Sequence, residues 1–166
     1  MEISSVTLAE SLSPEDLRGM LAEHPLVENM DPRHLQMMAD IVQRAHFDAG
    51  HYLFREGEPA ERFYLITKGS VMLEVYNADY GPISIQNLGS GDVMGWSGFI
   101  PPHHWRFDAK VCQPTDALVF DTQLLQRMCE VHTDFGYDFM KRVAGLVEQR
   151  LNATKEHLQD AYSRPR

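Results

Sequence analysis

Eight histidines and two cysteines are the side chains of this sequence best suited to binding a metal ion. Their spacing does not fit a metal site. His103 and His104 are adjacent, so a regular strand would turn them to opposite faces, and the chain has no His-x-His or His-x-x-x-His pair. Cys112 and Cys129 do not form a Cys-x-x-Cys pair, and we expect both to be reduced thiols. The sequence therefore predicts no metal centre.

Acid–base chemistry has little more support. Asp108 follows closely after Arg106, and Asp92 precedes Ser97, but acidic residues beside strands usually face solvent or cap turns. The chain has no nucleophile elbow, no P-loop and no pair of carboxylates on an obvious common face. We therefore expect no enzymatic activity.

The elements that would position a binding site change type along the chain. Ser13 precedes Pro14 and Asp31 precedes Pro32, and each pair is typical of a helix N-cap followed by proline at the first helical position. Over residues 45–121, glycine and proline recur roughly every 8 to 12 residues between short β-branched and aromatic runs, which predicts antiparallel strands. Helical periodicity returns after residue 121, with a short helix and then a long one over about 133–161.

The predicted fold is mainly β: an antiparallel, double-stranded, jelly-roll-like β-roll with short N-terminal helices and a long C-terminal helix. We expect one structural domain with an N-terminal helical segment (1–44), a ligand-binding β-roll core (45–121) and C-terminal helices (122–166). Lys68-Gly69 is predicted to be the turn of a tight hairpin, because glycine supplies the positive φ that such a turn needs. The eight expected strands lie at 45–47, 52–54, 62–67, 70–76, 83–88, 92–94, 106–113 and 117–120.

Composition and charge limit the class of partner. The 166 residues are 43% hydrophobic and 23% charged, as in one ordinary globular domain. The 15 Lys and Arg against 24 Asp and Glu give a net charge of −9, which would repel a nucleic-acid backbone. No run of 18 apolar residues occurs, and the first thirty residues are not those of a signal peptide. We expect a cytoplasmic protein that binds neither nucleic acid nor membranes directly.

The order of elements resembles the cyclic-nucleotide-binding domain, the sensor module of Crp/Fnr-type bacterial regulators and of regulated kinases and channels. Three segments carry the likeness, which extends over about residues 35–158. Residues 47–60 (FDAGHYLFREGEPA) resemble the family's first glycine-marked strands, 63–71 (FYLITKGSV) its most recognisable hairpin, and 88–95 (LGSGDVMG) the approach to its phosphate-binding cassette. The resemblance implies a stand-alone sensor with a small ligand.

The cassette itself departs from the family pattern. In the family it reads as a Gly-Glu pair, a short helix, and an Arg followed by Ser or Thr; the Arg and backbone amides hold the cyclic phosphate, and the Glu accepts a hydrogen bond from the ribose. Here Trp96 follows Gly95 where the Glu would stand. By resemblance, the predicted ligand-binding residues are Gly95, Trp96, Ser97, Trp105, Arg106 and Phe107.

Strand alternation leaves two arrangements open at Trp105-Arg106-Phe107, because neighbouring side chains point to opposite faces. If Arg106 faces the interior of the roll, it can hold an anion together with the amides of residues 95–97. If Trp105 and Phe107 face inward, they line or fill the interior, which then suits an uncharged or aromatic ligand, or none. The ligand is accordingly cAMP, cGMP, another small anion or an aromatic molecule, or the site is empty.

The long helix is predicted to carry the output. An apolar row continues past the length that the roll can cover, through Val147, Leu151, Thr154 and Leu158. In the resembling regulators this helix forms the dimer interface, so we expect a homodimer. The sequence predicts a non-catalytic small-ligand sensor without its own DNA-binding domain, which acts within the dimer or on a separate protein partner. The alternative is a degenerate, ligand-free β-roll that serves as a dimerisation or protein-interaction module.

Overall fold

A computed structural model describes residues 12–163 of the chain. Two short α-helices with a 3-10 turn between them come first: α1 (Pro14–Ala22), η1 (Pro25–Val27) and α2 (Pro32–Ala39). Both predicted caps are confirmed. The Ser13 hydroxyl accepts a hydrogen bond from the backbone N–H of Asp16 at 3.2 Å, and the Asp31 carboxylate accepts one from Arg33 at 2.8 Å.

The strands form one antiparallel sheet that is rolled on itself, and the predicted fold class is confirmed. Along the sheet the order is β1 (Gln43–Phe47), β6 (Asp108–Asp121), β3 (Arg62–Asn77) and β4 (Gly81–Leu88). The short strands β2 (Tyr52–Phe54) and β5 (Val93–Met94) pair with β6 and β3 respectively. A 3-10 turn, η2 (Trp96–Phe99), follows β5.

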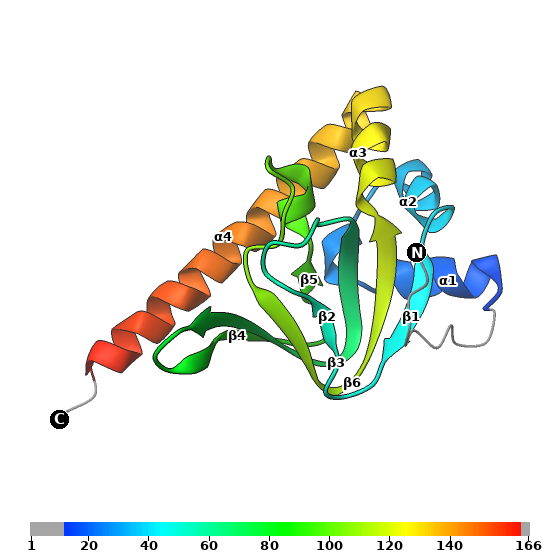
Figure 1. Ribbon diagram of the computed structural model, residues 1–166. Helices are drawn as coiled ribbons and strands as arrows, with labels where there is room; N and C mark the ends of the chain where they lie inside the picture. Colours follow the sequence, from blue (N-terminus) through cyan, green and yellow to red (C-terminus); the bar gives the residue numbers. More distant parts are fainter. Residues whose placement is uncertain (1–11, 164–166) are drawn as a thin grey trace.

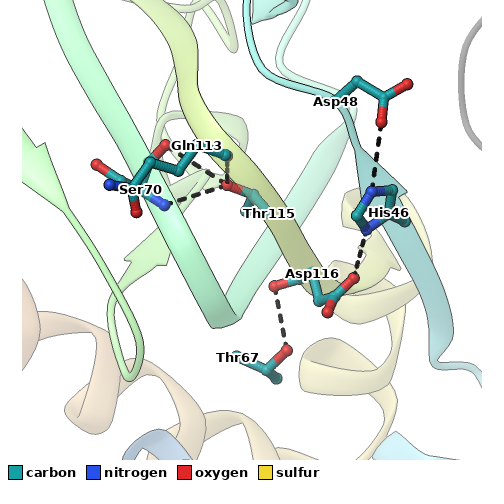
Figure 2. A network of polar contacts seen from close by, with 7 residues as sticks. All are labelled: His46, Asp48, Thr67, Ser70, Gln113, Thr115 and Asp116. Carbon is teal, nitrogen blue, oxygen red and sulfur yellow. Dashed lines mark hydrogen bonds and ion pairs between the residues drawn. The ribbon is translucent and has the colours of Figure 1, made fainter.

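The predicted hairpin at Lys68-Gly69 is wrong, and residues 12–163 form six strands instead of eight. Strand β3 runs straight through Gly69, whose φ of 112° marks a bulge where its pairing with β6 shifts. A Cβ atom on Gly69 would lie 2.4 Å from the hydroxyl oxygen of Thr115. That hydroxyl accepts from the Ser70 N–H at 3.2 Å and donates to the Gln113 carbonyl at 2.8 Å (Figure 2). The glycine therefore lets two long strands bend together.

A charged contact joins the edge strand β1 to β6 close to this bend. The His46 ring lies between two carboxylates, with Nδ1 2.7 Å from Asp116 and Nε2 3.4 Å from Asp48 (Figure 2). The hydrogen bond to Asp116 raises the pKa of His46 above its ordinary value, because the carboxylate stabilises the protonated ring.

Two apolar cores divide the molecule. One fills the interior of the roll, and the other lies between the roll and the helices, where Phe135 and Phe139 are fully buried. These two residues belong to α4 (Thr133–Ser163), which follows α3 (Thr122–Val131). Figure 1 shows α4 running along one side of the roll, from α3 to the hairpin that β4 forms with β3. Residues 151–163 of α4 are exposed along their whole length. No helix within residues 12–163 is long and apolar enough to span a membrane.

Candidate ligand-binding site

Gly95 sets the geometry of the predicted cassette. It is buried with φ of 117°, and a Cβ atom there would lie 2.6 Å from the carbonyl oxygen of Arg62. Only glycine fits this left-handed and enclosed position. It allows the chain to turn out of β5 into η2, where Ser97 is buried and Trp96 is half-buried. Gly95, Trp96 and Ser97 therefore lie together at the surface of the roll that faces α4.

The ring of Trp96 is covered by Arg150, a residue of α4 that the sequence analysis did not identify. The guanidinium carbon lies 4.5 Å from the ring centroid, a cation–π contact. Nη2 donates a hydrogen bond to the backbone carbonyl of Val93, whereas Nη1 is enclosed and has no partner among residues 12–163. Burial lowers the pKa of Arg150 to about 10, although the negative charge of Asp92 opposes this shift.

Trp105 occupies the interior of the roll. Its side chain is only 4% exposed, and the indole stacks on the Phe54 ring with centroids 3.4 Å apart and an angle of 4° between planes. Tyr64 lies beside it at 6.4 Å, and the partly buried Phe107 lies 6.4 Å from Phe54. Arg106, between the two aromatic residues, is exposed and makes no side-chain hydrogen bond or ion pair with the rest of residues 12–163. Of the two arrangements left open by the sequence, the structure has the one with the aromatic residues inward.

The inward aromatic residues remove the simplest anion site. Arg106 faces solvent and lies on the opposite side of its segment from the interior, so it does not join residues 95–97 in one pocket. The interior is packed with apolar side chains, which would disfavour a charged phosphate. They are Ala45, Phe47, Phe54, Ala60, Tyr64, Ile66, Val71, Leu73, Leu88, Met94, Trp105, Ala109, Val111, Ala117 and Val119. A ligand-binding role for Trp105, Arg106 and Phe107 stays a prediction.

An open pocket lies instead between the sheet and the exposed half of α4. Its volume is about 310 Å³, and both walls carry hydroxyl, amide or imidazole groups among apolar ones. Thr154, predicted to continue the dimer row, lines this pocket. The lining residues are Met72, Ser84, Ile85, Gln86 and Asn87 from β3 and β4, and Ala153, Thr154 and His157 from α4. Figure 1 shows the β4 hairpin beside this part of the helix.

The sequence contains a signal for the face of α4 that lines the pocket. Arg150, Thr154 and His157 are spaced by four and three residues, which places polar side chains on one face of a helix. The sequence analysis placed Thr154 in the apolar row with Val147 and Leu151 and did not identify this polar face. No group of three or more metal-ligating side chains is present in the part of the chain that the structure describes.

Comparison with known proteins identifies the family. The family model of the cyclic nucleotide-binding domain matches residues 44–132. Among curated proteins, the cGMP-dependent protein kinase egl-4 of Caenorhabditis elegans is 29% identical over 80 residues, which are 48% of this chain and 10% of the kinase. The chain thus spans only a small part of that relative.

Two solved structures extend the likeness to the fold. A chain from Geobacter metallireducens, described as a candidate cyclic nucleotide-binding protein, has a TM-score of 0.71 and 26% identity, with 85% of this chain and 99% of that one covered. The regulatory subunit of a cAMP-independent protein kinase A from Trypanosoma cruzi, bound to guanosine, has a TM-score of 0.66 and 22% identity, covering 93% of this chain and 55% of that one. Because the family model matches more than half of its residues, this chain belongs to the cyclic nucleotide-binding domain family.

Proposed function

We propose that the chain is a non-catalytic, cytoplasmic sensor domain that binds a small ligand in the pocket between β4 and α4. The ligand is a cyclic nucleotide or another small anion. The observation that carries this proposal is the pocket itself, since one of its walls is the sheet of the roll and the other is a helix that is free of the core from residue 151 onward.

The chemistry of the pocket suits a nucleotide-like molecule. Its volume of about 310 Å³ is at the lower end of the range for small-molecule sites. Ser84, Gln86 and Thr154 offer hydroxyl and amide groups that can donate to or accept from a ligand, and Met72 and Ile85 offer apolar surface for a flat ring. The guanosine-bound kinase subunit from Trypanosoma cruzi supports a nucleoside as one ligand of this fold.

Helix α4 supplies the readout. A ligand in the pocket contacts both the sheet and the exposed half of the helix. Binding therefore favours one placement of the helix against the sheet over others. The face of α4 next to the pocket carries Val147, Leu151 and Leu158, which are 38%, 67% and 54% exposed. An exposed row of this spacing is suited to pairing with the same helix of a second copy. The output is then the geometry of a homodimer, or the contact of that helix with a separate protein partner.

Isothermal titration calorimetry with cAMP, cGMP and guanosine tests the proposal. Ala153→Trp places a large side chain in the pocket wall, and we expect it to abolish binding. Asn152→Trp is the matched control, because the neighbouring residue is equally exposed but lies about 100° away around the helix. Saturable heat that survives Asn152→Trp and disappears in Ala153→Trp supports the pocket. Saturable heat that Ala153→Trp leaves unchanged would place the site elsewhere.

A second candidate function has one specific observation in its favour. The stacked Trp105 and Phe54 fill the interior of the roll, as expected of a degenerate module that binds no ligand and acts only through its surfaces. No heat with any of the three compounds, together with a stable dimer in sedimentation, would favour this alternative.

A further inference from the structure

The side chain of Arg150 is a half-buried cation that forms no ion pair within residues 12–163. None of the ion pairs among residues 12–163 includes it, and Nη1 has neither solvent access nor a hydrogen-bond acceptor. Its contacts are a neutral carbonyl, that of Val93, and the face of the Trp96 ring. Arg142, eight residues earlier on α4, shows the contrast, because Asp138 and the carbonyls of Leu26 and Glu28 accept its hydrogen bonds at 2.7–2.9 Å.

A partly buried charge without an ion-pair partner is unfavourable, since the charge of Asp92 offsets only part of the lost hydration. Burial lowers the pKa of Arg150 to about 10, in line with this loss of hydration. A ligand anion would provide the missing partner, because it adds to the hydrogen bond an attraction between opposite charges, and in bidentate geometry a second hydrogen bond, that one carbonyl cannot offer. The guanidinium would therefore exchange the Val93 carbonyl for an anion within reach.

The pocket between β4 and α4 begins one helical turn after Arg150. Ala153 and Thr154 line it, and the Thr154 hydroxyl donates to the backbone carbonyl of Arg150 at 2.9 Å. Arg150 does not itself line the pocket, but it lies on the same face of the helix as the lining residues Thr154 and His157. Arg106 cannot serve there, because it is exposed on the segment that leads into β6.

We propose that Arg150 is the anion-recognition residue of this domain. In the free protein the guanidinium rests on Trp96 and the Val93 carbonyl, and it pairs with the anionic group of a ligand bound between β4 and α4. This inference rests on the proposed function and adds the ligand class, namely a negatively charged nucleotide in preference to the uncharged nucleoside. It also assigns to α4 the cation that the cassette lacks.

Calorimetry with cGMP and guanosine tests the inference, because the cyclic phosphate ester distinguishes the first compound from the second. We expect wild type to bind cGMP about tenfold more tightly than guanosine, as one ionic hydrogen-bonding contact provides. Arg150→Gln keeps a donor for the Val93 carbonyl but removes the charge, and we expect it to reduce this preference to below about twofold. Arg106→Gln is the matched control and should keep the full preference.

Two further measurements separate recognition from a structural role. In a Trp105→Phe background, Trp96 is the only tryptophan, and its emission should change with cGMP but not with guanosine as Arg150 leaves the ring. Thermal unfolding without ligand should give Arg150→Gln a Tm equal to or above that of wild type, since a partly desolvated charge without an ion-pair partner is removed.

The outcomes that overturn the inference differ from those that overturn the proposed function. Equal affinity of wild type for cGMP and guanosine, or a preference that survives Arg150→Gln, overturns the role of Arg150 and leaves the sensor intact. A lowered Tm of Arg150→Gln with unchanged cGMP preference identifies Arg150 as a structural clamp only. Binding of neither compound overturns both proposals.

Discussion

Replacing Trp105 with alanine tests whether the aromatic residues of its segment hold the roll together from inside. The indole is 4% exposed, so the substitution removes nearly all of a large buried side chain. Changes of this kind lower the free energy of unfolding by about 3–5 kcal/mol, because the protein loses the burial of the removed apolar atoms and is left with a cavity. Since a domain of this size is stable by about 5–15 kcal/mol, Trp105→Ala should remove at least about a fifth of the total.

Part of this loss belongs to the stack with Phe54. Two rings 3.4 Å apart and nearly parallel should show a coupling energy of about 0.5–1.5 kcal/mol in a double-mutant cycle. Arg106→Ala is the matched control one residue away. Because that side chain is exposed, we expect a change within about 0.5 kcal/mol.

Urea unfolding followed by far-ultraviolet circular dichroism measures both variants without relying on tryptophan emission. A loss below about 1 kcal/mol in Trp105→Ala, or a larger loss in Arg106→Ala than in Trp105→Ala, would refute the reasoning. In that case the segment would have the opposite arrangement, with the guanidinium directed into the roll.

Three other predictions concern the bend, the edge strand and the helix. Gly69→Ala should lower the free energy of unfolding in urea by about 2 kcal/mol or more, because the new Cβ atom combines an unfavourable positive φ with a contact of 2.4 Å. Gly50→Ala is the control and should cost less, because Gly50 also has a positive φ but has open space around it. Asp116 raises the pKa of His46 in the folded state, so the pair stabilises the fold fully below the unfolded-state pKa of 6.5, and this stabilisation is lost as pH rises through the folded-state pKa. His46→Gln should therefore flatten this part of the curve of unfolding free energy against pH. An unchanged curve would exclude the ion pair. Leu151→Asp should shift sedimentation from dimer to monomer, and a mass that does not change would show the dimer prediction to be wrong.

The sequence was sufficient to predict the β-roll and the long helix, because glycine and proline punctuation and helical periodicity are local signals. It was insufficient at Gly69, because a positive φ is equally typical of a hairpin and of a bulge, and only the strand paired opposite decides between them. The expected strand alternation at 105–107 does not apply, because β6 begins only at Asp108, and alternation could in any case not decide which of these side chains faces inward. That choice depends on Phe54, a residue fifty positions away with which Trp105 stacks.

Arg150 illustrates a different limit. An arginine on a predicted exposed helix is usually solvated, and neither its spacing nor its neighbours in sequence indicate burial. Its partial burial follows from the position of Trp96, whose ring the turn at Gly95 places against the guanidinium of Arg150. The sequence analysis identified Trp96 as a site residue but could not identify the residue that covers it.

The uneven attachment of α4 determines where a ligand can act. Its first half is fixed by the fully buried Phe135 and Phe139 and by Arg142, which binds two carbonyls of the η1 segment. Beyond Arg150 the helix is exposed and faces β4 across the pocket. The contacts that hold the helix are therefore concentrated in its first half, and a ligand in the proposed pocket would move the second half only to the extent that its affinity differs between two helix orientations. Because Arg150 stands at the boundary between the halves, an anion that draws it from Trp96 would release a contact at the point where the exposed half of the helix begins.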